Sequence, residues 1–243
     1  MLPPNTSPKT RGVLFYTDSC IGEPIGSIVQ KQILKSGLPI TSVSHKPLDF
    51  GNNIVLPLVR SYPSIVKQII TGLKASNEDY VFFTEHDVLY HKSHFDFEPK
   101  RDDIFYYNAN VWRWDYPKDR AFTYSRLLQL SALCVNREFA LDHYQKRLAK
   151  IKGVGWDMVV KGEPEWVRKM GYEPGTKKKK RGGFSNDDFE TWWSEYPNID
   201  IRHKDTFSPP KLTLDEFKHK PINWQEMKVT QVPGWDIKTL FNL

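Results

Sequence analysis

Runs of consecutive apolar residues alternate with helical periodicity in the N-terminal part of the chain. Apolar runs at 13–16 and 80–84 and a strand-like segment at 40–44 predict strands. Between them, 25–36 has a helical pattern, and the apolar residues of 62–73 recur at i, i+3, i+4 and i+7, which predicts an amphipathic helix. Continuously apolar strands separated by helices are typical of a parallel sheet that is covered on both faces.

The pattern changes after Tyr90, where short strand-like segments replace the strand–helix alternation. Such segments predict antiparallel or mixed pairing. They lie at 104–107, 111–114, 121–124 and 129–135. A helix is predicted over 141–151 and a later strand over 199–203. From Gly153 onward the chain is otherwise rich in Gly, Pro, Trp and charged residues, which predicts irregular structure.

One domain accounts for these elements. A chain of 243 residues fits one large domain or two small ones, and no break in composition divides it. We expect an α/β, Rossmann-related domain with a mixed, mainly parallel sheet and an irregular C-terminal part. Its expected parts are a nucleotide-binding half at 12–90, an acceptor half at 91–205 and a tail at 206–243.

The positive charge of the chain is concentrated in one segment. The formal net charge is +6, and five of these charges come from a single run, so the remainder carries only +1. That run consists of Lys177, Lys178, Lys179, Lys180 and Arg181. A nearly balanced body with one cationic loop predicts that contact with a polyanion is confined to that loop. The alternative is an ordinary solvated charge run.

Nothing in the sequence predicts a secreted or membrane-bound protein. No apolar run approaches the roughly 18 residues of a membrane span, and the segment 1–10 is polar and rich in proline. Cys20 and Cys134 are too few for a disulfide framework or a cysteine-rich zinc cluster. We therefore expect a soluble, cytoplasmic protein. Neither a Gly-x-Gly-x-x-Gly fingerprint nor a P-loop is present, which argues against a dinucleotide enzyme and a P-loop kinase.

Two acidic residues follow the most apolar predicted strand. If the chain stays extended after 80–84, Glu85 and Asp87 project to one side and His86 to the other. Ligands of open α/β sheets bind at the carboxyl ends of the strands, and carboxylate oxygens suit Mg²⁺ or Mn²⁺. We therefore expect a divalent metal site at Glu85 and Asp87. A solvated strand end with capping acids is the alternative.

An apolar strand that ends in an acid-x-acid triplet, after a strand–helix–strand half, resembles the Asp-x-Asp motif of GT-A fold, nucleotide-sugar-dependent glycosyltransferases. The resemblance covers roughly residues 12–205 in the order of elements, and Glu85 departs from the Asp of the motif's first position. The resemblance implies a GT-A-like fold in which Asp87 binds Mn²⁺ or Mg²⁺ directly. It also implies a late histidine ligand, and His203, at the end of the strand 199–203, is the matching residue.

The same resemblance implies a donor site and a catalytic base. Thr17 and Asp18 match the position at which the family holds the nucleoside of a nucleoside-diphosphate sugar, most simply a UDP-sugar, and Arg60 is placed to reach the phosphates. Asp188, with Asp187 next, matches the acidic motif that supplies the base in inverting members. An ordinary helix start also explains these two acids, and a retaining enzyme needs no such base. The implied activity is hexosyl or pentosyl transfer.

The acceptor is less constrained. Because the cationic run precedes the expected base, one hypothesis is DNA with a hydroxymethylated base, flipped out as in phage-type DNA glycosyltransferases. A glycan, a lipid-linked sugar or a protein are the alternatives. Trp112, Trp114 and Tyr116 alternate along one predicted strand, and such a stripe either stacks on a ligand ring or packs in the core.

Two other classes of function remain open at this point. His91 and His94, with His86 and the neighbouring acids, form a dense cluster that would suit a zinc-dependent hydrolase or nuclease, although their spacing matches no common zinc motif. A non-catalytic nucleic-acid binder is the third possibility. Release of UDP from a UDP-sugar, dependent on a metal ion, separates the transferase from both.

Overall fold

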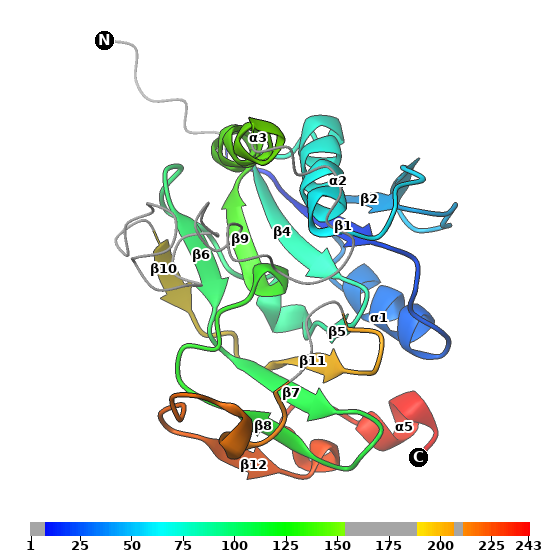
Figure 1. Ribbon diagram of the computed structural model, residues 1–243, viewed down its shortest axis with the longest axis vertical. Helices are drawn as coiled ribbons and strands as arrows, with labels where there is room; N and C mark the ends of the chain where they lie inside the picture. Colours follow the sequence, from blue (N-terminus) through cyan, green and yellow to red (C-terminus); the bar gives the residue numbers. More distant parts are fainter. Residues whose placement is uncertain (1–7, 154–188, 207–210) are drawn as a thin grey trace.

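The computed structural model describes residues 8–153, 189–206 and 211–243, which contain two β-sheets (Figure 1). The larger sheet has the strand order β10-β6-β9-β4-β1-β2-β3. Its strands are β1 (Arg11–Thr17), β2 (Ile40–Ser44), β3 (Asn52–Val55), β4 (Tyr80–Glu85), β6 (Phe105–Asn108), β9 (Leu133–Asn136) and β10 (Phe189–Trp192). Only β9 pairs antiparallel with its neighbours in this sheet. The expected mixed, mainly parallel α/β sheet is therefore confirmed.

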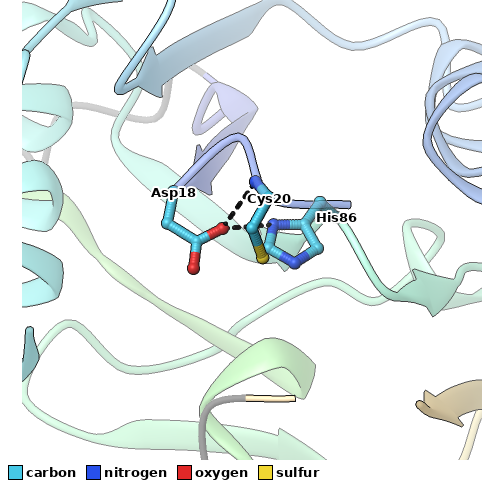
Figure 2. Close-up of side chains that lie close together, drawn as sticks. All are labelled: Asp18, Cys20 and His86. Carbon is cyan, nitrogen blue, oxygen red and sulfur yellow. Dashed lines mark hydrogen bonds and ion pairs between the residues drawn. The ribbon is translucent and has the colours of Figure 1, made fainter. Parts of the chain in front are cut away.

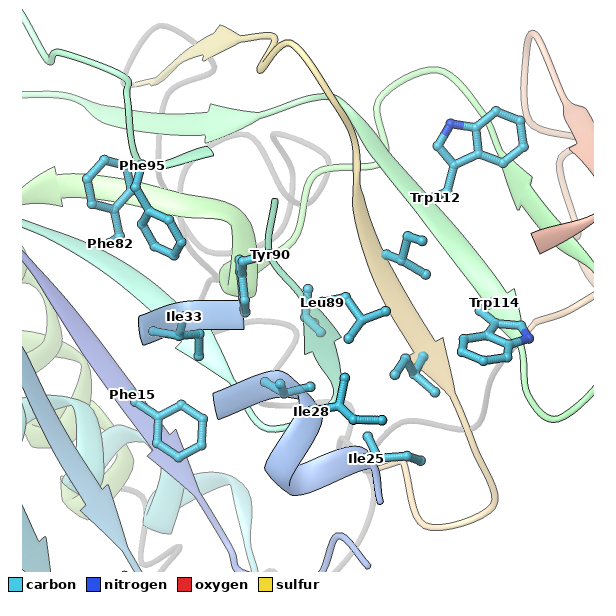
Figure 3. Close-up of a cluster of buried hydrophobic side chains, with 14 of the residues drawn as sticks. Phe15, Ile25, Ile28, Ile33, Phe82, Leu89, Tyr90, Phe95, Trp112 and Trp114 are labelled. Atoms are coloured by element: carbon cyan, nitrogen blue, oxygen red, sulfur yellow. The ribbon is translucent and has the colours of Figure 1, made fainter. Parts of the chain in front are cut away.

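The two faces of the larger sheet bury alternate side chains of the same strands. Helices α2 (Tyr62–Ala75) and α3 (Arg137–Gly153) cover one face, where they pack on Leu14 and Tyr16 of β1. Val13 and Phe15 point to the opposite face, toward α1 (Ile25–Leu34). Figure 3 shows Phe15 and Phe82 on this second face beside α1. Because both faces are covered, the central strands β1 and β4 contain continuous apolar runs without polar alternation.

The smaller sheet has the order β12-β8-β7-β11-β5. Its strands are β5 (Val88–Leu89), β7 (Val111–Asp115), β8 (Ala121–Thr123), β11 (Asn198–Arg202) and β12 (Gln225–Met227). Leu89, Trp112 and Ile199 of this sheet share a core with α1 and the larger sheet (Figure 3). The tail contributes β12 and the short helix α5 (Ile237–Phe241) to this layer, where the ring of Phe241 lies 4.8 Å from that of Trp114.

Short 3₁₀ helices connect several of these elements. They are η1 (Lys92–His94), η2 (Leu130–Ala132), η3 (Leu214–Glu216) and η4 (Val229–Gln231). The helix η2 occupies part of the segment 129–135, for which the sequence predicts one strand. Within the described ranges, no helix combines the length and apolar character needed to cross a membrane.

The aromatic stripe of β7 is mainly a core feature. Trp114 is fully buried, and its indole Nε1 donates a hydrogen bond to the carbonyl of Lys118 at 2.7 Å. The ring of Tyr116 packs edge-on against Trp114. Trp112 is 7% exposed and also lines a surface groove, described below. Of the two expectations for this stripe, core packing holds for Trp114 and Tyr116.

Candidate functional site

The carboxyl ends of β1, β2 and β4 meet at one edge of the larger sheet. The chain leaves β1 toward β2 on one side and returns as β4 on the other side of β1, so the connections reverse direction between β1 and β4. Crevices at such switch points are where open α/β sheets bind ligands. A pocket of about 490 Å³, open to solvent, lies at this edge. Its lining includes Thr17, Asp18, Arg60, Glu85, His86 and Asp87.

The pairing of β5 with β11 brings Asp87 to His203. After β4 ends at Glu85, residues 86 and 87 form a turn, and β5 then runs antiparallel to β11. The Ile201 amide donates a hydrogen bond to the Asp87 carbonyl at 2.8 Å, which fixes Asp87 beside the end of β11. His203 Nε2 consequently lies 3.5 Å from Asp87 Oδ2. The expected proximity of these two residues is present in the structure.

His86 joins this pair. One donor atom from each of His86, Asp87 and His203 lies within 4.8 Å of the other two. The Thr17 hydroxyl is 2.6 Å from His86 Nδ1, and this contact orients the imidazole ring. Outer contacts of this kind fix the ring orientation of histidine ligands in metal sites. The three side chains form a mixed nitrogen and oxygen donor set at the rim of the pocket.

The chemistry of this donor set fits a divalent ion. His203 Nε2 is buried and has no hydrogen-bond partner in the described part of the chain. Its separation from the Asp87 carboxylate approaches the roughly 3 Å expected between adjacent ligands with bonds of about 2.1 Å. The Asp205 amide donates to His203 Nδ1 at 3.2 Å, so coordination through Nε2 requires this contact to open and Nδ1 to carry the proton.

Asp87 is held as an anion. Its burial acts to raise the pKa of the carboxyl group, but the contact with His203 and the charges of His86 and Arg202 outweigh burial and lower the pKa below its usual value. Asp87 is only 8% exposed. A buried, ionised carboxylate beside two imidazoles is well suited to hold a cation.

Glu85 lines the same pocket as Asp87 but has a different hydrogen-bond partner. Its Oε1 accepts a hydrogen bond from the Tyr16 hydroxyl at 2.6 Å, and burial, together with the charge of Asp87, raises the pKa of Glu85 to about 8. Two groups of possible metal-donor residues include His86 among the described residues, and Glu85 belongs to neither of them. The expectation that His86 lies opposite the two acids is wrong: 86–87 is a turn and not extended chain, and Glu85, His86 and Asp87 all line the pocket. A part for Glu85 in metal binding stays a prediction.

Asp18 organises the other side of the pocket. Figure 2 shows it beside Cys20 and His86, and its Oδ1 accepts a hydrogen bond from the Cys20 amide at 3.0 Å and lies 3.8 Å from His86 Nδ1. Arg60 donates both to Asp18 and to the carbonyl of Asp205. Burial acts to raise the pKa of Asp18, but these contacts outweigh it and lower the pKa. The predicted residues Asp18 and Arg60 are thus brought together.

Cys20 lies beside Asp18 on the same side of the pocket (Figure 2). Asp18, Cys20 and His86 form a second group whose donor atoms lie within 4.8 Å of one another. Burial, and then the neighbouring Asp18, raise the pKa of the Cys20 thiol to about 12. The thiol is therefore protonated at neutral pH, and Cys20 is an exposed residue.

The N-terminus of α2 faces the pocket. Ser61 caps this helix by accepting a hydrogen bond from the Ser64 amide at 3.2 Å, and Pro63 occupies the first turn. Gln68 donates to the carbonyl of Thr17 at 2.7 Å and so ties α2 to the end of β1. The positive end of a helix next to Arg60 favours a bound anion such as a phosphate.

Sequence reasoning missed two contributors to the pocket. His45 follows β2 directly and lines the pocket, and its Nε2 is buried with no hydrogen-bond partner among the described residues. His45 follows the end of β2 just as Asp18 follows the end of β1. Its position after a strand would therefore have been enough to include it among the candidates. The second contributor is His86. Its side chain was expected from the sequence on the side opposite the two acids and was therefore not included among the metal ligands.

The proposed zinc cluster of His91 and His94 does not form. His94 is fully buried, and its Nδ1 accepts hydrogen bonds from the amides of Asn108 and Asn198 at 3.1 and 3.0 Å. Its ring packs against Phe82 and other aromatic side chains. Neither histidine belongs to a group of metal donors within the described residues. The hydrolase or nuclease expected from the 85–94 cluster is therefore not supported, because His94 is a core residue.

Several predicted residues lie outside the described ranges. They are the expected bases Asp187 and Asp188 and the cationic run Lys177, Lys178, Lys179, Lys180 and Arg181.

Comparison with known proteins gives only distant similarity. No protein-family model and no curated protein matches the sequence. Among solved structures, the glycosyltransferase GlyE of Streptococcus pneumoniae TIGR4 matches with a TM-score of 0.39 and 13% identity, over 60% of this chain and 39% of its own. A nucleotidyl transferase from Methanothermobacter matches with a TM-score of 0.40 and 10% identity, over 62% of this chain and 82% of its own.

A third solved structure is a mutant of the Drosophila β-1,4-galactosyltransferase 7 in complex with manganese, UDP-Gal and xylobiose. It matches with a TM-score of 0.34 and 12% identity, over 60% of this chain and 62% of its own. The chain thus spans less than two thirds of the length of this protein and of the pneumococcal one. At such identities and TM-scores, the similarity indicates no substrate or activity for this chain.

Proposed function

We propose that the protein is a metal-dependent glycosyltransferase that moves a hexosyl or pentosyl group from a nucleoside-diphosphate sugar, most simply a UDP-sugar, to a hydroxyl group. One observation carries the proposal. Asp87 and His203, from distant parts of the chain, meet within 3.5 Å at the switch point of the sheet, next to a pocket lined by Asp18 and Arg60. An arrangement of cation ligands beside an anion-binding helix end suits a substrate that carries a diphosphate.

Asp87, His203 and His86 are the residues that would hold the ion. Imidazole nitrogen and carboxylate oxygen together suit Mn²⁺, whereas Mg²⁺ prefers oxygen ligands alone. Bound there, a divalent ion would neutralise the charge that develops on the leaving diphosphate. Glu85 remains a candidate ligand from the sequence, and its contact with Tyr16 gives it a structural role in either case.

The other pocket residues would bind and orient the donor. The ionised Asp18 carboxylate can accept hydrogen bonds from ribose hydroxyls, and the Thr17 side chain lies beside it. Arg60 and the N-terminus of α2 supply positive charge for the phosphates. Binding of phosphate would draw the Arg60 guanidinium into a shared contact with Asp18 and the anion.

The transfer also needs the acceptor proton to be removed. We propose Asp188, with Asp187 as the second candidate, as the base: the acceptor oxygen bonds to the anomeric carbon, the bond to the diphosphate oxygen breaks, and the hydroxyl proton passes to the carboxylate. This assignment rests on the sequence motif alone. Asp188→Asn should lower the rate of transfer by about 10²- to 10⁴-fold in an inverting enzyme.

A DNA acceptor remains a proposal that rests on the sequence alone. It depends on Lys177, Lys178, Lys179, Lys180 and Arg181, and no observation on the described residues supports it. Changing these five residues to serine should abolish binding to DNA and its steep salt dependence, if that binding exists. A cytoplasmic location is likewise a proposal that rests on the sequence alone.

The experiment that tests the function measures release of the nucleoside diphosphate from a panel of nucleotide sugars with Mn²⁺ and with EDTA. We expect release that requires the metal and that falls at least 100-fold, as an order-of-magnitude estimate, in Asp87→Asn and His203→Ala. The matched controls are Asp142→Asn, on the exposed side of α3, and His219→Ala, in the tail; both should behave as the unchanged protein. Release without a metal, or equal release in Asp87→Asn, would contradict the proposal.

A further inference from the structure

A second hollow lies where the two sheets meet. The edge strand β10 of the larger sheet and strands β7, β8 and β12 of the smaller sheet enclose a groove of about 1300 Å³ that is open to solvent. The groove is separate from the pocket at the switch point, since the two share no lining residue. Strand residues supply Trp112, Thr123, Phe189, Thr191 and Gln225, and the other lining residues come from the segments that connect the strands.

The walls of this groove are aromatic. Trp193 follows β10 and is 71% exposed, an unusual state for the largest apolar side chain. Tyr124 is held at the other wall, where its ring stacks on Trp224 and its hydroxyl accepts a hydrogen bond from Arg113 at 3.0 Å. Trp112 also lines the groove and is largely buried. Flat ring faces at fixed positions suit ligands that present flat apolar faces of their own.

The polar groups of the groove are almost all uncharged. They come from amide and hydroxyl side chains, and Arg126 is the one charged residue among those that line it in the described part of the chain. The uncharged polar residues are Asn110, Thr123, Ser125, Thr191, Asn223 and Gln225. The side chains of Gln225 and Arg126 make no hydrogen bond within the described ranges. Amides and hydroxyls both donate and accept hydrogen bonds, as sugar hydroxyls do.

We propose that this groove binds the acceptor, and that the acceptor is a neutral oligosaccharide. Sugar rings would stack on Trp193 and Tyr124, while the amides of Asn223 and Gln225 bond to hydroxyl groups. A single-stranded nucleic acid would also stack on aromatic rings, but it needs a cationic track along its phosphates, and one arginine does not provide it. The inference rests on the proposed function, because it names the acceptor of that reaction.

The position of the groove indicates a chain of sugars and not a single one. Strands β4 and β6 run in the same direction, since both pair antiparallel with β9, so their carboxyl ends lie at the same edge of the sheet. The groove starts at Ala109 and Asn110, directly after β6, two strands away from the end of β4. Two strand spacings are about 10 Å, so a ligand of several rings is needed to reach from the groove toward Asp87.

The test is binding of the full-length protein to an array of immobilised neutral and acidic glycans, followed by calorimetric titration of the strongest ligand. Neither metal nor nucleotide sugar is added, so the result does not depend on the donor site. We expect retention of neutral glycans and an affinity that rises with the number of rings. Trp193→Ala and Gln225→Ala should each weaken binding at least about tenfold. Leu34→Ala, an exposed apolar residue of α1, is the matched control and should bind as the unchanged protein.

Three results would overturn the inference. One is that no neutral glycan is retained; another is that retention is equal in Trp193→Ala and the unchanged protein. The third is that a twelve-residue single-stranded oligothymidylate binds more tightly than any glycan and loses affinity in Trp193→Ala, which would assign the groove to nucleic acid. Neutral glycan binding without metal-dependent release of a nucleoside diphosphate would leave the groove as a glycan-binding site, but would remove the transferase and with it the role of the groove in binding an acceptor.

Discussion

The contact between Asp87 and His203 depends on a two-residue turn. Residues 86 and 87 leave the strand β4, and the backbone of Asp87 is then fixed by the Ile201 amide. Because the carboxylate is attached to a segment that is itself hydrogen-bonded, its position before ligand binding is already close to that of the histidines. Ligands held in advance lose little conformational entropy when a cation binds.

The different environments of Asp87 and Glu85 give the first prediction. Asp87→Asn should weaken Mn²⁺ binding by more than about tenfold. The removal of a residue that binds the ion directly lowers the affinity at least as much as the removal of a residue that only contacts a ligand. Glu85→Gln should bind Mn²⁺ nearly as well as the unchanged protein, since Glu85 faces Tyr16 and the amide retains an acceptor for that hydroxyl. Calorimetric titration with Mn²⁺ measures both. Equal losses in the two variants would place Glu85 among the ligands.

The limits of sequence reasoning at this scale follow from local and non-local geometry. Asp87 can be predicted because it follows an apolar strand of a parallel sheet, and such ends lie at one edge, whereas Asp18 was expected from the family resemblance. The proximity of His203 was expected only from a family resemblance, because it depends on the pairing of β5 with β11. The orientation of His86 could not be predicted, because alternation of side chains stops where the strand stops.

Among the elements, α2 shows how closely a helix must approach the sheet to position the pocket. At Gly72 an added Cβ would lie 2.1 Å from Cδ1 of Leu14, a fully buried residue of β1. Only the absence of a side chain therefore allows the helix to lie at this distance from the strand. The same approach lets Gln68 reach the carbonyl of Thr17.

Gly72→Ala should accordingly destabilise the protein. In an open helix this change would add about 1 kcal/mol of stability, but overlap in a packed core costs about 1–3 kcal/mol. We expect a net loss in the free energy of unfolding, measured with urea. Lys74→Ala, exposed on the same helix, should change this free energy by less than about 0.5 kcal/mol. A stability of Gly72→Ala equal to or above that of the unchanged protein would mean that α2 is not held at this distance.

The helix η1 carries a buried histidine whose titration affects folding. Burial lowers the pKa of His94 to about 3, so the folded protein keeps this ring neutral. The unfolded chain takes up the proton near pH 6.5, and stability is therefore lost as pH falls from about 6.5 toward 3. Between pH 7 and pH 5 the loss due to His94 is about 2 kcal/mol, at 1.36 kcal/mol for each pH unit below the unfolded pKa.

Replacement of His94 should remove this pH dependence. His94→Gln keeps an acceptor for the two asparagine amides but carries no titratable group. Its free energy of unfolding is expected to be lower at pH 7 and to fall by about 2 kcal/mol less between pH 7 and pH 5. Urea unfolding at both pH values measures the difference. The exposed His219→Gln should keep the original slope; an unchanged slope in His94→Gln would contradict the prediction.

The order of elements was accessible from the sequence, and the arrangement of the second sheet was not. The runs at 13–16, 40–44 and 80–84 became β1, β2 and β4, since a covered parallel sheet requires apolar residues on both faces. β3 was not predicted, because its sequence Asn-Asn-Ile-Val at the sheet edge is half exposed and lacks an apolar run. Partners such as β11 with β5 and β12 with β8 are far apart in the chain, and periodicity carries no information about them.

At the scale of the whole molecule, the proposed metal ligands connect the two sheets. His86 and Asp87 follow β4 of the larger sheet, whereas His203 follows β11 of the smaller one. An ion bound by all three would link the two layers in the folded state only. Binding that occurs in the folded state alone raises the free energy of unfolding.

Mn²⁺ and UDP should therefore raise the melting temperature together. Each ligand at 100 times its dissociation constant is expected to contribute about 2.7 kcal/mol, which corresponds to roughly 5–10 °C per ligand for a protein of this size. A thermal-shift measurement with and without EDTA tests this. The increase should be absent in Asp87→Asn and present in Asp142→Asn. An equal increase in both variants would mean that the ion binds elsewhere.

Strand β11 has neighbours on both sides that serve different purposes. On one side β5 follows the turn of Asp87, and on the other β7 carries Trp112 into the wall of the groove, opposite Ile199. Insertion of one residue just before Asn198 would rotate every side chain of this strand to the reverse face. The approach of His203 to Asp87 and the pairing of Ile199 with Trp112 would then be lost together, so this strand tolerates substitutions that keep its length far better than insertions or deletions.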